Sequence, residues 1–234
     1  MVEVFSGVGN RPVVDVSAPD VVACGLEICL FGPMEVRVGG RSLPRLRSRK
    51  GLWLLALLAL RAGRDVDRDW LAGTLWSEHR EDAARRSLRQ SLHDLRAALG
   101  ADAARVSCES PRSLRLDLAP GSGTWADILS FDAATNRIAT ATPAALEAAV
   151  ALYRGPLLQD CAEEWALEER RERETRYIAA LERLAELAGA RGDHRTAADY
   201  LQRALDGDPL REDLLRAQMT VLAASGSISA AREA

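Results

Sequence analysis

The sequence predicts an α+β part over residues 26–118 and an all-α part over residues 127–234. The first part mixes short alternating apolar runs, bounded by Gly and Pro, with three helical patterns, whereas helical periodicity dominates the second. The charge changes too: residues 26–118 hold 17 Lys and Arg against 12 Asp and Glu, although the whole chain has a net charge of −3. A basic part followed by an acidic part suits a nucleic-acid-binding module joined to a protein-binding module.

The α+β part is expected to begin with strands. Residues 1–25 mix Gly, Pro, Ser and Val without helical periodicity, so we expect a disordered leader. Strands are predicted over residues 26–31 and 34–38, on either side of a Gly-Pro turn signal. A short extended piece over residues 41–46 is expected to add a third strand or an edge.

Three helices and a hairpin follow. The first helix, residues 48–62, is apolar on nearly every side and is therefore predicted to be buried. A short second helix over residues 68–75 precedes a long third helix over residues 82–100. Two alternating strands, joined by Ser110-Pro111-Arg112, form the predicted hairpin. This order predicts a winged helix-turn-helix domain, in which the third helix enters the major groove of DNA and the hairpin is the wing.

The third predicted helix has two opposed faces. One stripe consists of leucines that must be buried, namely Leu88, Leu92, Leu95 and Leu99. The outer face is expected to meet DNA, because Arg and Gln read base edges and phosphates in the major groove. The predicted DNA-binding residues on this helix are Arg85, Arg86, Arg89, Gln90, His93 and Arg96. Asp82 is expected to cap the helix and Gly100 to end it. The alternative is an ordinary amphipathic surface helix whose arginines are only solvated.

Two further groups of cations are predicted to contact DNA. Arg47, Arg49 and Lys50 lie at the start of the first helix, where cations oppose the helix dipole and a bound phosphate would compensate. The alternative is that these side chains simply reach solvent. The predicted wing supplies Arg112 and Arg115.

The all-α part contains a repeated spacing. Residues 119–126 are rich in Gly, Ser and Pro and are predicted to be a linker between two parts with separate cores. Beyond the linker, similar residues recur 34 positions apart, such as Gly192 and Gly226 or Leu181 and Leu215. This is the tetratricopeptide spacing, and such repeats stack into a surface that binds proteins or peptides. The alternative is a plain helical bundle. The chain stops inside an expected second helix of a repeat, so we expect the natural protein to continue.

Both parts resemble one family. The phrase SLRQSLHDLRAALG, with LAGTLW before it, resembles the recognition helix of SARP-type (Streptomyces antibiotic regulatory protein-like) transcriptional regulators, and LYRGPLL with EEWALEERRE resembles their bacterial transcriptional activation domain. The resemblance implies an OmpR-type winged helix whose Arg86, Arg89, Gln90, His93 and Arg96 face DNA. Relatives often carry an arginine nearer the wing turn than Arg112. Asp94 would repel phosphate, so we expect it to pair with Arg85, Arg86 or a partner.

Other classes of function lack support in the sequence. No GxxxxGK[ST] or GxGxxG motif occurs, and four scattered cysteines with three histidines give neither a zinc pattern nor a disulfide framework. We therefore expect no enzyme activity, no cofactor, no metal and no membrane contact, in a cytoplasmic protein. The expected partners are promoter double-stranded DNA, RNA polymerase and a second copy of the chain on DNA. The alternative function is a tetratricopeptide-type interaction scaffold whose winged helix does not bind DNA.

Overall fold

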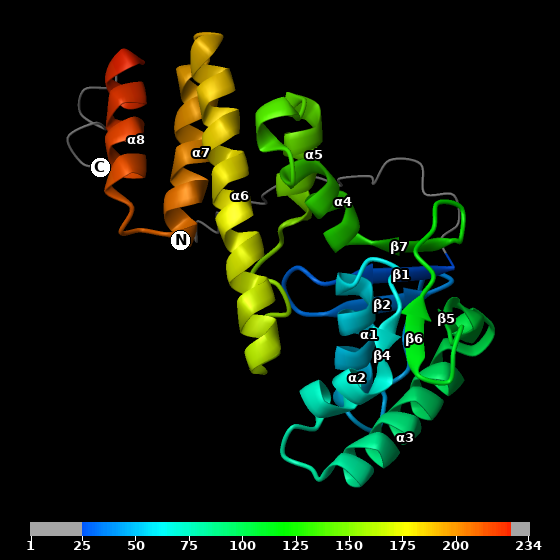
Figure 1. Ribbon diagram of the computed structural model, residues 1–234. Helices are drawn as coiled ribbons and strands as arrows, with labels where there is room; N and C mark the ends of the chain where they lie inside the picture. Colours follow the sequence, from blue (N-terminus) through cyan, green and yellow to red (C-terminus); the bar gives the residue numbers. More distant parts are fainter. Residues whose placement is uncertain (1–24, 226–234) are drawn as a thin grey trace, which may run out of the picture.

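The computed structural model describes residues 25–225, and it joins a mixed α/β part to a row of helices (Figure 1). The predicted leader lies outside the described residues, apart from Gly25. The first part contains β1 (Leu26–Cys29), β2 (Glu35–Val38), β3 (Arg41–Ser42), α1 (Lys50–Leu60), β4 (Val66–Asp67), α2 (Arg68–Leu75), α3 (Glu81–Leu99), η1 (Gly100–Arg105), β5 (Val106–Ser107), β6 (Ser113–Leu116) and β7 (Thr124–Ala126). The second contains α4 (Asp127–Thr135), η2 (Ile138–Thr140), α5 (Pro143–Leu152), α6 (Glu164–Ala190), α7 (His194–Gly207) and α8 (Glu212–Ala224).

The winged helix-turn-helix prediction is confirmed. The hairpin β5–β6 pairs with β4 in a three-stranded sheet, so the wing is fastened to the strand that leads into α2. The Asp67 side chain caps α2 by accepting bonds from the Asp69 and Trp70 amides. Helix α1 is buried along nearly its whole length, as its continuous apolar sequence predicts.

The predicted linker is partly wrong, because residues 124–126 form β7. This strand pairs in parallel with β1, with Leu26 opposite Thr124 and Ile28 opposite Ala126, and completes a four-stranded sheet in the order β3-β2-β1-β7. The Asp127 carboxylate, just beyond β7, accepts bonds from the Leu30 amide at 2.8 Å and the Phe31 amide at 3.0 Å. Three residues of the supposed linker therefore belong to the sheet of the winged helix.

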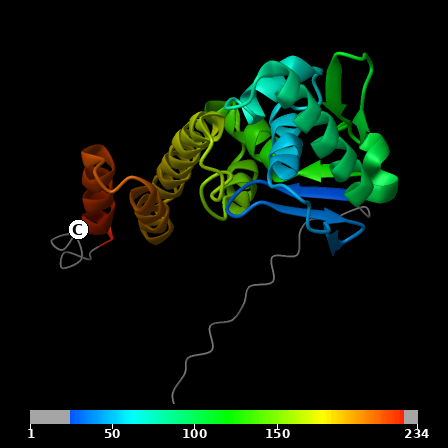
Figure 2. The same ribbon diagram turned by 90° about the horizontal axis from the view of Figure 1, so that it is seen from below.

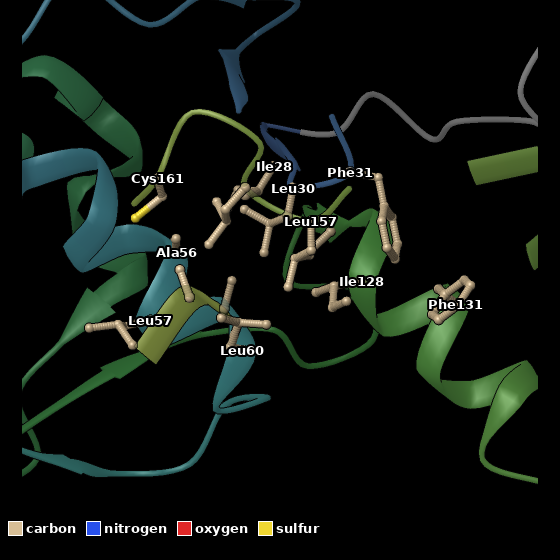
Figure 3. Close-up of a cluster of buried hydrophobic side chains, with 14 of the residues drawn as sticks. Ile28, Leu30, Phe31, Ala56, Leu57, Leu60, Ile128, Phe131, Leu157 and Cys161 are labelled. Atoms are coloured by element: carbon tan, nitrogen blue, oxygen red, sulfur yellow. The ribbon is translucent and has the colours of Figure 1, made fainter. Parts of the chain in front are cut away.

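The two parts share one core, so the prediction of separate cores is wrong. The Phe31 ring, which follows β1, meets the Phe131 ring of α4 edge-on at a centroid distance of 4.8 Å. Figure 3 shows Ile28 and Leu30 beside Leu157, in one cluster with side chains of α1 and α4. The amide of Leu158 donates to the Leu30 carbonyl at 2.8 Å, so main-chain bonds cross the same boundary. One hydrophobic cluster runs from β1 into the helical part.

The helical part ends in three helices that lie side by side, α6, α7 and α8 (Figure 1). Gly192 adopts a φ of +78° after α6, which lets the chain turn back, and the Asp193 side chain caps α7. The all-α tetratricopeptide-like prediction is confirmed as a fold class, although the predicted repeat position at Gly226 lies outside the described residues. No helix within residues 25–225 is long and apolar enough to cross a bilayer. Figure 2 shows α7 and α8 at the end of the molecule remote from α3 and the wing.

Candidate nucleic-acid interface

Helix α3 presents one apolar face and one charged face. The predicted leucine stripe is confirmed, because Leu88, Leu92, Leu95 and Leu99 are all buried. The helix begins at Glu81, one residue earlier than predicted, so Asp82 lies in the first turn instead of capping it. Gly100 ends the helix with a φ of +57°, as predicted. Burial of the leucines fixes which side of the helix faces solvent.

The solvent face of α3 contains four of the six residues predicted for this helix. Arg86, Arg89, Gln90 and His93 are exposed. The Gln90 amide donates to the Asp94 carboxylate at 2.8 Å, so within the chain Asp94 is paired with Gln90 and not with Arg85 or Arg86. No ion pair involves Arg86 or Arg89 within residues 25–225, which leaves both guanidinium groups available to an external anion.

Arg85 and Arg96, the other two residues predicted on α3, form bonds inside the domain. The Arg85 guanidinium donates to both oxygens of Asp69, at 2.7 and 3.0 Å, and also contacts Glu81. The Arg85 bond holds the pKa of the Asp69 carboxyl below its usual range. Arg96 donates to the Val106 carbonyl at 2.8 Å. These two arginines tie α3 to α2 and to the wing, a structural use that periodicity alone does not indicate.

The cations at the start of α1 have different surroundings. The Lys50 ammonium group lies 2.7 Å from the Glu163 carboxylate, the residue that precedes α6. The Glu163 carboxylate therefore balances the charge of Lys50, for which the sequence predicted a bound phosphate. Arg47 and Arg49 are exposed and form no ion pair within the part of the chain that the structure describes.

Of the two wing arginines predicted to contact DNA, one forms ion pairs inside the domain and the other is exposed. Arg115 on β6 contacts Asp65 at 3.1 Å and Glu109 at 2.6 Å, so its charge is balanced inside the domain. Arg112, in the turn of the wing, is exposed and has no acidic partner among residues 25–225. The structure brings Arg112 close to Arg89 and to Arg68, which line one hollow with it. Arg68 was not predicted, and its place directly after the cap of α2 is the only sequence signal for it.

The arrangement suits binding of a polyanion. The exposed cations lie on α3, at the wing turn and before α1, and no group of His, Cys, Asp and Glu within residues 25–225 is arranged to hold a metal ion. A rigid helix that presents arginine, glutamine and histidine side chains, with a wing beside it, can contact both base edges and phosphates of a duplex.

Comparisons with known proteins found one family match and a match to a solved structure. Residues 130–234 match the family described as the bacterial transcriptional activator domain. The solved structure of Mycobacterium tuberculosis EmbR in complex with a low-affinity phosphopeptide has the same fold, with a TM-score of 0.67 and 24% identity over 88% of this chain. The match covers 57% of the EmbR chain. No curated protein matches significantly. The family match covers the part of the chain in which the sequence predicted an activation domain, and EmbR shares the fold of the described chain.

Proposed function

We propose that this chain is a sequence-specific DNA-binding activator of transcription, because residues 130–234 match the bacterial transcriptional activator domain. One observation carries the DNA-binding half of the proposal. The leucine stripe of α3 is buried, and the opposite face presents Arg86, Arg89, Gln90 and His93 to solvent. A helix with a purely structural role needs only the buried leucine face, whereas a recognition helix also needs an exposed face of polar and cationic side chains.

In this proposal α3 lies in the major groove of a promoter. Arg and Gln side chains form bidentate bonds with guanine and adenine edges, so Arg86 and Gln90 are the proposed base readers. Gln90 would exchange its exposed bond to Asp94 for one to the base. Arg47 and Arg49 are proposed to contact backbone phosphates, which position the domain without reading sequence. Lys50, Arg85, Arg96 and Arg115 are left out of the DNA contacts, because acids or carbonyls inside the molecule already hold them.

The helical part is proposed to bind protein. Residues 119–234 are acidic overall, and a negative surface gains nothing from phosphate. Helices α7 and α8 lie far from α3 (Figure 2), which would leave them accessible on bound DNA. RNA polymerase and a second copy of the chain are the proposed partners, in the cytoplasm, where a bacterial promoter is found.

Selection of bound sequences from a random duplex pool, followed by titration at several salt concentrations, tests the proposal. We expect an enriched sequence motif and an affinity that falls steeply with salt. Arg86→Ala should weaken binding to the motif by about 1–3 kcal/mol and relax the preference at one position. Arg137→Ala, an exposed arginine between α4 and η2, is the matched control and should bind like wild type. Absence of duplex binding would favour the interaction-scaffold alternative.

A further inference from the structure

A hollow lies where three elements of the winged helix meet. Its lining includes Arg68 from the start of α2, Arg89 from α3 and Arg112 from the wing turn. Main-chain bonds hold two of these residues together, because the Arg68 amide donates to the Arg112 carbonyl at 2.8 Å and β4 pairs with β6 beside them. The positions of Arg68 and Arg112 relative to each other are therefore set by the backbone.

The charge of this hollow is not balanced. Asp69 lines it, but both oxygens of that carboxylate already accept bonds from Arg85, at 2.7 and 3.0 Å. No Asp or Glu within residues 25–225 forms an ion pair with Arg68, Arg89 or Arg112. Three guanidinium groups from three different elements thus border one space, and the carboxylate that lines it is already bonded to Arg85. Like charges that border one space repel one another, and an external anion would reduce that repulsion.

We infer that the hollow binds a phosphate group of the DNA backbone, held by Arg68, Arg89 and Arg112. The inference rests on the proposed function, because it requires α3 to lie in the major groove. In that position the helix before the recognition helix crosses the sugar-phosphate backbone, and the hollow opens between these two helices and the wing. The planar guanidinium matches phosphate geometry and can bind it through two bonds.

This assignment separates two roles on the exposed surface. Arg89, predicted together with the base-reading residues, becomes a phosphate contact, and Arg68 joins the interface although the sequence did not suggest it. Arg86, Gln90 and His93 lie outside the lining and remain for base edges. Arg85 borders the hollow but acts through Asp69, as a positioning residue that joins α2 to α3.

Salt titration on generic DNA tests the inference, because phosphate contacts do not depend on sequence. The probes are two mixed-sequence duplexes of about 30 base pairs, roughly three helical turns. Arg68→Gln and Arg112→Gln should each reduce the slope of log affinity against log salt by about one, and weaken binding about eightfold near 0.1 M salt on both duplexes. Arg68→Lys, which keeps the charge, should recover most of the slope. Arg137→Gln removes an exposed charge elsewhere and should change neither quantity. Thermal melting establishes that each variant is folded.

The possible outcomes separate the two proposals. Wild-type slopes in Arg68→Gln and Arg112→Gln, combined with weaker binding by Arg86→Ala, would overturn the phosphate site and leave the proposed function standing. An effect on one duplex only would also overturn it, because that result indicates a base contact. If wild type shows no salt-dependent binding to either duplex, the proposed function fails and the phosphate site fails with it.

Discussion

Replacing Phe131 by alanine tests whether the two parts of the chain unfold together. The Phe131 side chain is 0% exposed and lies at the start of the helical part. Its ring packs against Phe31, at the end of the strand region of the winged helix, with centroids 4.8 Å apart. A second aromatic contact, to Tyr153, has a centroid distance of 6.4 Å. Removal of the ring therefore leaves a cavity between the two parts.

The cost of this cavity can be bounded. Phe→Ala in a core costs about 3–5 kcal/mol, because the surroundings relax only partly around the lost volume. Full burial and two aromatic partners place Phe131 in the middle of that range, so we expect about 4 kcal/mol. Native proteins have total stabilities of about 5–15 kcal/mol, so this loss would be a large fraction of the free energy of unfolding. The measurement is equilibrium unfolding in urea, followed by far-ultraviolet circular dichroism and by tryptophan fluorescence.

A shared core predicts one transition seen by both probes, in wild type and in the variant, with the midpoint lowered equally for each. Four of the five tryptophans, Trp53, Trp70, Trp76 and Trp125, lie in the first part, whereas circular dichroism is dominated by the helical part. Leu210→Ala is the control, since that side chain is 89% exposed and its loss should cost less than about 0.5 kcal/mol. Two separate transitions, with only the dichroism curve shifted by Phe131→Ala, would refute the shared core.

Two further predictions concern buried residues. Burial raises the pKa of Asp127 from 3.8 to about 6, so the folded state holds this proton more tightly than the unfolded state. The contribution of Asp127 to stability is therefore largest below about pH 4, falls by up to about 1.4 kcal/mol per pH unit towards pH 6, and is constant above. In urea unfolding from pH 4 to 7, the free energy of unfolding should fall less for Asp127→Asn than for wild type. Parallel plots of unfolding free energy against pH would contradict the assignment. Leu95→Ala, on the buried stripe of α3, should cost about 2–5 kcal/mol because the side chain is 0% exposed, and an unchanged melting temperature would show that the stripe does not face the core.

Features that depend on neighbours along the chain could be predicted from the sequence. The buried stripe of α3 follows from leucines spaced three and four residues apart, and Gly100 ends the helix because it readily adopts a positive φ. The exposed face of α3 follows from the same periodicity, so Arg86 and Gln90 were found to be exposed as expected.

Features that depend on distant residues could not be predicted. Lys50 is held by Glu163, 113 residues away, and no local pattern indicates such a pair. Residues 124–126 follow two glycines and form a strand of three residues, too short to show alternation, so only the parallel pairing with β1 identifies it. Arg68 belongs to the candidate site through a bond to Arg112 across the wing sheet, which the order of residues does not reveal.

The parallel pairing of β1 with β7 has a consequence for synthesis of the chain. Asp127 and its partner Leu30 are 97 residues apart, so the first strand leaves the ribosome long before the strand that covers its edge. At about 5–20 residues per second, that interval lasts roughly 5–20 seconds. Throughout it, β1 has an uncovered edge, the kind of surface that pairs with other chains. The winged-helix part of the newborn chain therefore completes its sheet only after translation has passed Ala126.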